Sequence, residues 1–304
     1  MNQELIPVYE EMEEQIKKIS NNKEKKSEPI CISGRPIYLP LNGHKIEVTY
    51  YKAKKKNAPI IFGVYGGEFT RDNYYYDDLF WHMIHNEFEC NVVSISYKNF
   101  RKSKFPCAIN DVYDVICYFM KNASQIDFDT NKVIIFGSSI GANFATSAAL
   151  LDRANNTNYI KTQILNYPCL DLTTTTNKGI YGNFITPDKY VNDVAELKNP
   201  FVSPIYASQE ELKGMPKTIM ICGEEDNFSC EGEKYARMLQ SSGTEVYYQN
   251  YSEMEPGFVE LYFLLKYMPL KSQSLSSKMK ENFISGKLYK SVMSAIQFIK
   301  EHVI

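Results

Sequence analysis

The chain has 304 residues, 44% of them apolar and 23% charged, with a formal net charge of −2. An apolar fraction of this size supports a sizeable core and excludes disorder throughout the chain, and the balanced charge argues against a nucleic-acid-binding surface. The seven cysteines are odd in number and show no CxxC spacing, so we expect buried thiols in a reducing compartment, with no disulfide framework, metal site or cofactor.

The first 28 residues predict a helix followed by a polar linker. Apolar residues recur at intervals of three or four between positions 3 and 20, as in an amphipathic helix; they are Leu5, Val8, Met12, Ile16 and Ile19. We interpret residues 1–28 as a cap or lid over a domain formed by residues 29–304, with a helix packed on the body as the alternative. The sequence shows no signal-peptide pattern and no run of ~18 apolar residues. We therefore expect a cytoplasmic protein without a membrane span.

Short β-branched runs then alternate with helical patterns. The expected strands are 45–51, 59–64, 91–96, 132–136, 160–166, 218–222 and 245–250. The expected helices are 109–119, 139–153, 230–240 and 288–302, with a further helix that contains His82 and His85. This alternation predicts an α/β fold, in which a mostly parallel sheet has helices on both faces. Residues 171–215 show no strand pattern, and we interpret them as an excursion that contributes to a cap.

The sharpest motif is a strand, a Gly-x-Ser-x-Gly turn and a helix. The buried run 132–136 leads into Gly137, Ser138, Ser139, Ile140 and Gly141. The two glycines permit a turn so tight that a larger side chain would clash with neighbouring backbone, and the turn exposes the Ser139 hydroxyl. The N-terminus of the following helix, including the Ile140 N–H, favours negative charge there. The motif predicts a nucleophilic serine, with an idle serine in a structural turn as the alternative.

From about residue 45 onwards the chain resembles the hormone-sensitive-lipase family of α/β-hydrolases. Besides the Ser139 turn, the resemblance rests on segments that occur in the family's order: 62–69, 93–97, 104–108, 166–168, 202–204 and 222–236. It implies an α/β-hydrolase fold and a carboxylic-ester hydrolase of the esterase or lipase type, acting on small acyl esters. It also implies that Asp226 is the triad acid and that the N–H groups of Gly67, Glu68 and Ile140 form the oxyanion hole.

The triad histidine is missing from the position that the resemblance gives it. The family carries it in a His-Gly-Phe segment after the last strand, and this chain has Pro256 followed by Gly257 and Phe258. Proline has no side-chain nitrogen that could accept a proton. The remaining histidines are His44, His82, His85 and His302. The sequence places none of them near Asp226.

Two further departures lie on the oxyanion side. Tyr65 replaces the histidine that opens the family's motif, and Glu68 replaces its third glycine. A carboxylate ~5 Å from a developing oxyanion would oppose it by roughly 3 kcal/mol at an effective dielectric constant of 20. Together with Pro256, these departures argue for weak or altered hydrolysis.

The sequence leaves two main hypotheses open. In the first, the chain is a weak or modified carboxylesterase with Ser139 as nucleophile, Asp226 as acid and an unidentified base. In the second, it is a pseudo-esterase that binds a small molecule in the former active-site pocket, as a plant hormone receptor of the same family does. An interaction scaffold is a third alternative. We expect a small-molecule ester or ligand as partner, with no nucleic acid, and the sequence is compatible with a homodimer.

Overall fold

The structure, a computed structural model, describes residues 34–41, 43–67, 78–98, 103–173, 187–224, 226, 228–254, 256–260, 262 and 286–303. Its centre is an eight-stranded sheet in the order β1-β2-β4-β3-β5-β6-β7-β8. The strands are β1 (Arg35–Leu41), β2 (His44–Tyr51), β3 (Ala58–Val64), β4 (Asn91–Ser96), β5 (Phe128–Ser138), β6 (Thr162–Asn166), β7 (Lys217–Gly223) and β8 (Val246–Tyr251). The pairs β1–β2 and β2–β4 are antiparallel, and all the other pairs in this sheet are parallel.

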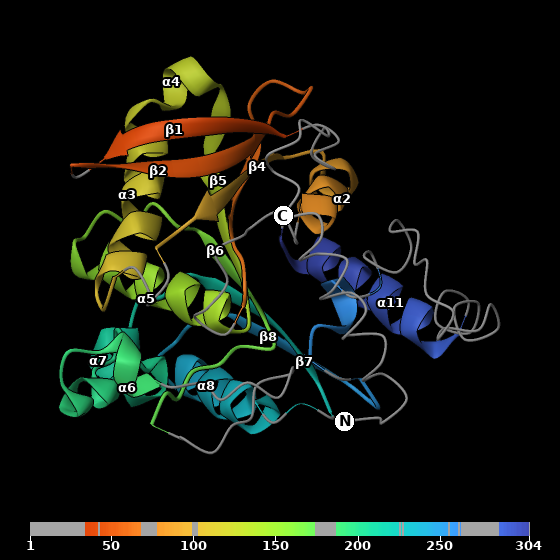
Figure 1. Ribbon diagram of the computed structural model, residues 1–304. Coiled ribbons are helices and arrows are strands. Elements are labelled where there is room, and N and C mark those ends of the chain that lie inside the picture. The colour runs from red at the N-terminus through yellow and green to blue at the C-terminus, as the bar shows by residue number, and fades with distance from the viewer. Residues whose placement is uncertain are drawn as a thin grey trace, which may run out of the picture.

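Helices cover both faces of the sheet (Figure 1). They are α2 (Asp78–Phe88), α3 (Cys107–Lys121), α4 (Ala123–Ile126), α5 (Ile140–Ala154), α6 (Pro187–Tyr190), α7 (Gln209–Leu212), α8 (Ser229–Ser241) and α11 (Lys287–Val303), with 3-10 helices η4 (Val194–Lys198) and η5 (Pro204–Tyr206). The helices α2 and α11 pack on one face, and α3, α5 and α8 pack on the other.

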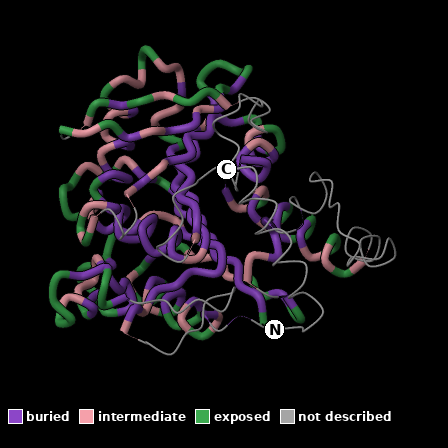
Figure 2. Tube along the Cα trace, in the orientation of Figure 1, coloured by how far each residue is buried: buried purple, intermediate pink, exposed green. Residues whose placement is uncertain are grey.

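The central strands are buried on both sides (Figure 2). Along β5, Val133 and Ile135 belong to the apolar cluster shared with α3, α5 and α8, whereas Ile134 and Phe136 belong to the cluster shared with α2 and α11. Successive side chains of a strand point to opposite faces. Ser138, the last residue of β5, therefore has its side chain on the α2 and α11 face.

The predicted α/β-hydrolase fold is confirmed, including the mostly parallel sheet and the helices on both faces. All seven predicted strands are present, and 91–96 has the predicted bounds. Strand β1 is not predicted by the sequence, because Pro36 and Pro40 interrupt its alternation. It lies at the edge of the sheet, where proline is tolerated because one side of the strand has no ladder to complete.

The proposed cap is only partly covered by the described residues. The predicted helix between residues 3 and 20, and the whole of segment 1–28, lie outside them. Where the structure describes residues 171–215, they form short helices and no strand, and α7 and η5 contact α5 and α8. Their contribution to a cap stays a prediction. In the described part of the chain, no helix is both long and apolar enough to cross a lipid bilayer.

Candidate active site

The turn after β5 has the tight geometry that its glycines predict. Ser139 lies between β5 and α5 with φ 55° and ψ −123°, and a residue with a side chain rarely adopts a positive φ. A Cβ on Gly137 would lie 2.4 Å from the Gly141 carbonyl oxygen, and a Cβ on Gly141 would lie 2.2 Å from the carbonyl oxygen of Val64. The surrounding backbone therefore fixes Ser139 in a strained conformation, which is common at functional sites.

Backbone hydrogen bonds hold this turn at the carboxyl edge of the sheet. The Ser139 N–H donates to the carbonyl of Asn166, the last residue of β6, at 2.9 Å. The Ser139 carbonyl accepts from the N–H groups of Ala142 at 3.0 Å and Cys169 at 3.3 Å. The start of α5 and the segment 166–169 thus fix the backbone of Ser139.

We expect Gly141→Ala to lower the free energy of unfolding by an amount at the upper end of the roughly 1–3 kcal/mol typical of overpacking. The added methyl group would overlap the carbonyl oxygens of Val64 and Tyr65, which would lie 2.2 and 2.3 Å away. Urea denaturation measures the loss. Gly43→Ala is the control without a clash, because nothing lies within 4 Å of its Cβ position and only the strain of its φ of +80° opposes the methyl group. Equal losses in the two variants would show that the turn is not closely packed.

The loop after β3 lies directly over the Ser139 turn. A Cβ on Gly66 would lie 3.3 Å from Ser139 Cβ and 3.0 Å from the Ser138 carbonyl oxygen. Gly67 follows with φ 133°, which glycine adopts far more easily than other residues. Ile140 is the first residue of α5, so its N–H has no acceptor within the helix. The structure therefore places the Gly66–Gly67 loop and the first residue of α5 next to Ser139.

Tyr65 anchors this loop in place of the family's histidine. Its buried ring stacks on Tyr97 with the centroids 4.5 Å apart. The Tyr97 hydroxyl donates to the Tyr65 carbonyl at 2.8 Å. The stacking and the hydrogen bond with Tyr97 thus hold the loop where the family's histidine is replaced by Tyr65. Glu68, the predicted oxyanion-hole residue that replaces a glycine of the family's motif, lies outside the described residues.

Asp226 follows β7 and carries one carboxylate oxygen without a donor. It is only 6% exposed, and its Oδ1 accepts the Phe228 N–H at 2.9 Å. Oδ2 is buried with no hydrogen-bond partner among the described residues. Burial raises the pKa of this carboxyl to about 6, although the Phe228 N–H opposes the rise. In a triad, the acid's free oxygen accepts the ring N–H of the base, so the environment of Oδ2 fits an acid without its histidine.

Cys169 and Glu231 connect Asp226 to the Ser139 turn. The Cys169 N–H donates to the Ser139 carbonyl, and the pKa of its thiol is raised by burial first and then by the charges of Glu231 and Asp226. Glu231 accepts the N–H groups of Leu170 at 2.8 Å and Asp171 at 2.9 Å. Burial raises the pKa of Glu231 to about 7. The sequence did not single out Glu231, because its partners lie in a segment about 60 residues away.

The loop after β8 reaches the same turn but brings no base to it. Gly257, next to Pro256, has φ 80°, and a Cβ on it would lie 3.7 Å from the hydroxyl oxygen of Tyr167. A little further along, Glu260 Oε1 accepts the hydroxyl of Ser138 at 2.5 Å. Glu260 is a second residue that the sequence did not indicate. The segment that contains Pro256 is thus held beside the residue that precedes Ser139.

No histidine hydrogen-bonds to Ser139 or Asp226 in the described structure, and each has its own partner. His44 Nε2 pairs with Asp111 at 2.7 Å, His82 Nε2 accepts from Asn86 at 2.9 Å, and the Nδ1 atoms of His85 and His302 lie 2.7 Å from the carbonyl oxygens of Cys90 and Phe298. The four side chains therefore serve local structure.

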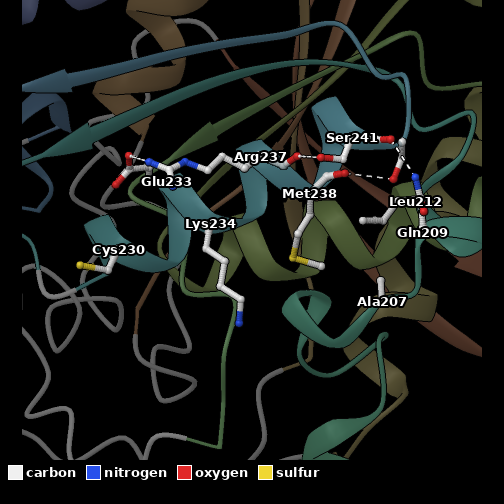
Figure 3. A pocket seen from close by; sticks show the side chains of 10 residues that line it. Ala207, Gln209, Leu212, Cys230, Glu233, Lys234, Arg237, Met238 and Ser241 are labelled. Carbon is white, nitrogen blue, oxygen red and sulfur yellow. Dashed lines mark hydrogen bonds and ion pairs between the residues drawn. The ribbon is translucent and has the colours of Figure 1, made fainter.

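An open groove of about 500 Å³ lies on the outer surface of α7 and α8 (Figure 3). Lys234 extends along it, and Arg237 pairs with Glu233 at 2.5 Å. Its lining includes none of the predicted site residues, so we do not assign the reaction to it. Among the residues that the structure describes, no cluster of three or more His, Cys, Asp or Glu side chains could hold a metal ion.

Comparison with known proteins gives a consistent result. A family model for the α/β-hydrolase fold matches residues 61–260. An arylesterase of Saccharolobus solfataricus is 27% identical over 220 residues, which cover 69% of this chain and 71% of that protein. A putative α/β-hydrolase of Acanthamoeba polyphaga mimivirus is 27% identical over 250 residues, covering 78% and 72% of the two chains.

Solved esterase structures share the fold. The esterase of Pyrobaculum calidifontis superposes with a TM-score of 0.74 at 22% identity, covering all of this chain and 94% of its own. A thermostable esterase from Pseudomonas putida has a TM-score of 0.74 at 21% identity, with 95% and 89% covered. These likenesses show that the eight-stranded sheet and its helices are arranged as in known esterases.

Proposed function

Because this chain belongs to the α/β-hydrolase-fold family whose model matches residues 61–260, we propose that it hydrolyses small acyl esters at Ser139, slowly, because the base is missing. Its fold and relatives are those of esterase-type α/β-hydrolases. One observation carries the proposal: Ser139 has a positive φ of 55° directly beneath the Gly66–Gly67 loop. Backbone strain of this kind is common at functional sites, and a turn between a strand and a helix exposes a serine hydroxyl at the edge of the sheet.

In the proposed reaction, Ser139 Oγ attacks the ester carbonyl carbon and forms a tetrahedral intermediate. The N–H groups of Gly67, Glu68 and Ile140 stabilise its oxyanion. Collapse of the intermediate expels the phenolate, or an alkoxide that takes its proton from solvent, and leaves an acyl group on Ser139. Water then attacks the acyl carbonyl carbon and releases the acid. Each attack needs a proton acceptor, and Pro256 provides none, so the Ser139 proton passes to solvent.

We expect turnover far below that of ordinary esterases. Removing the base from a serine protease triad costs about 2 × 10⁶ in kcat, and typical enzymes have a kcat of ~10 s⁻¹. With p-nitrophenyl acetate as substrate, wild-type protein should release p-nitrophenolate slowly but above the rate of the Ser139→Ala variant. Ser147→Ala, at a buried serine of the same helix, is the matched control and should match wild type. Equal rates for wild type and Ser139→Ala would exclude Ser139 as the nucleophile.

A second function is favoured by one observation: Asp226 Oδ2 is buried without a hydrogen-bond partner among the described residues, as in an acid that has lost its histidine. A pseudo-esterase would use this pocket to bind a small molecule without turning it over, and residues 1–28 would close over it. Absence of Ser139-dependent turnover, together with a ligand-dependent rise in Tm, would select this function.

The free thiols support a proposal about the compartment. Six cysteines of the described residues are free, a state that reducing compartments maintain. On this ground we extend the proposal to a cytoplasmic protein. The homodimer stays a prediction.

A further inference from the structure

A buried carboxylate contacts the residue that immediately precedes Ser139. Glu260 is 8% exposed and comes four residues after Pro256. Its Oε1 accepts two side-chain donors, the Ser138 hydroxyl at 2.5 Å and the Asn166 amide at 3.0 Å. Its Oε2 has no partner among the described residues. One oxygen therefore joins three segments that are far apart in the sequence.

Both donors also determine where Ser139 lies. Ser138 immediately precedes it, and the Asn166 carbonyl accepts the Ser139 N–H at 2.9 Å. Tyr167, the next residue, is a further hydrogen-bonding neighbour of Glu260, and its hydroxyl approaches Gly257. A displacement of Glu260 would thus move the turn and the loop with Pro256 relative to one another.

The loop after β8 has a second attachment at its outer end. Glu224 accepts the Ser252 hydroxyl at 2.7 Å and the Glu253 N–H at 3.1 Å. These contacts are exposed and lie at the start of the loop. Pro256 and Gly257 lie between the two attachments, and Glu260 provides the buried one.

Burying the Glu260 carboxylate costs free energy that a purely structural contact would not require. Burial raises the pKa of Glu260, and the hydrogen bonds from Ser138, Asn166 and Tyr167 only oppose the rise. Apolar side chains of similar volume often stabilise a protein as well as buried charged groups do, or better. A buried carboxylate with one satisfied oxygen is therefore better explained by the geometry that it enforces.

We propose that Glu260 is a positioning residue that ties the loop carrying Pro256 to the nucleophile turn, and so fixes the distance between residue 256 and Ser139. Its carboxylate hydrogen-bonds Ser138 and Asn166, so it acts on the reaction through these residues. This inference rests on the proposed function for its catalytic consequence, and on the hydrogen bonds alone for its structural part.

The first test is independent of catalysis. Amide hydrogen exchange of the peptide 252–260 is followed by mass spectrometry in the full-length wild type and in Glu260→Ala, Glu260→Gln and Asp152→Ala. Losing the buried attachment should speed exchange in this peptide by about tenfold or more, because local opening then needs less free energy. Glu260→Gln keeps an oxygen that can accept both donors and should stay near wild type.

Asp152→Ala is the matched control. Asp152 is a buried carboxylate that also accepts a hydroxyl and an N–H, from Thr157 at 2.6 Å and Ile160 at 2.9 Å, but these contacts lie at the far end of α5. The Asp152→Ala variant should have a lower free energy of unfolding, without a selective change in the exchange rate of the peptide 252–260. Unchanged exchange in folded Glu260→Ala would overturn the inference.

The second test measures kcat and KM for p-nitrophenyl acetate. Ser138 and Asn166 connect Glu260 to the Ser139 turn. A misplacement of this turn by about 1 Å can cost roughly 10²-fold in rate, so Glu260→Ala should lower the Ser139-dependent kcat by about 10- to 100-fold with KM nearly unchanged. Glu260→Gln should restore most of it. If Glu260→Ala does not fold, Ser138→Ala removes the 2.5 Å bond alone and should lower kcat in the same direction.

The two tests separate the inference from the proposed function. Faster exchange without any Ser139-dependent turnover in wild type would support the attachment and reject the esterase. Ser139-dependent turnover that is the same in wild type, Glu260→Ala and Ser138→Ala would support the esterase and reject Glu260 as a positioning residue.

Discussion

The Pro256→His variant is expected to hydrolyse p-nitrophenyl acetate about 10²–10⁴ times faster than wild type, the usual contribution of a positioned general base. The loop after β8 already reaches the nucleophile turn through Glu260 and Ser138. We expect a ring at position 256 to accept the Ser139 proton and to donate its other N–H to Asp226 Oδ2, which has no partner among the described residues. Full restoration is not expected, because Glu68 still replaces a glycine of the family's oxyanion motif.

Two controls show whether the gain comes from a triad. Pro256→Gln removes the proline ring without adding a base and should leave the rate near wild type. Combining Pro256→His with Ser139→Ala or with Asp226→Asn should erase the gain, since loss of the acid in a serine protease triad costs about 10⁴ in kcat. If folded Pro256→His shows no Ser139-dependent increase, position 256 does not face Ser139 and the assignment of the base position is wrong.

Asp226 should make the protein less stable as the pH rises. Its pKa is about 6 in the folded state and about 3.9 in an unfolded chain. Between these values the folded state keeps a proton that the unfolded state has lost, so the free energy of unfolding falls with increasing pH. The effect begins above the unfolded pKa, is complete above the folded pKa, and amounts to on the order of 3 kcal/mol.

Urea denaturation of wild type and Asp226→Asn at about pH 4 and pH 7 measures this effect, because the amide does not titrate. Relative to the variant, wild type should lose stability on going to the higher pH. In the Pro256→His background the loss should shrink, since an imidazole that donates to Oδ2 favours the ionised carboxylate. A difference between wild type and Asp226→Asn that does not change with pH would contradict the burial of this group.

The strands were predictable wherever burial sets the pattern. The apolar runs of β3, β4 and β7 are enclosed on both faces, so the sequence has to be continuously hydrophobic there. The first residues of β5, 128–131, were not predicted, because Phe128 is followed by the polar and partly or fully exposed Asp129, Thr130 and Asn131. The hydrophobic pattern that predicts a strand is clear where the strand is buried, and it is lost at the edges of the sheet and at the ends of strands.

The site was predictable where the backbone restricts the residue type. Gly137 and Gly141 stand where no Cβ fits, so the motif itself encodes the turn. Glu260 carries no such signal. Its partner Ser138 lies 122 positions away in the sequence, and a single glutamate belongs to no recognisable motif. Only the fold shows that these two side chains meet.

Mass spectrometry of the acyl-enzyme tests the central claim most directly, that Ser139 is a nucleophile without a base. With p-nitrophenyl acetate the phenolate leaves without a proton, whereas hydrolysis of the acyl-enzyme needs an activated water, so the second step should be the slower one. The account predicts a single acetyl group that accumulates on the peptide containing Ser139 and is absent from Ser139→Ala. An acetyl group that is missing from Ser139, or that turns over too quickly to accumulate at an ordinary kcat of ~10 s⁻¹, would contradict it.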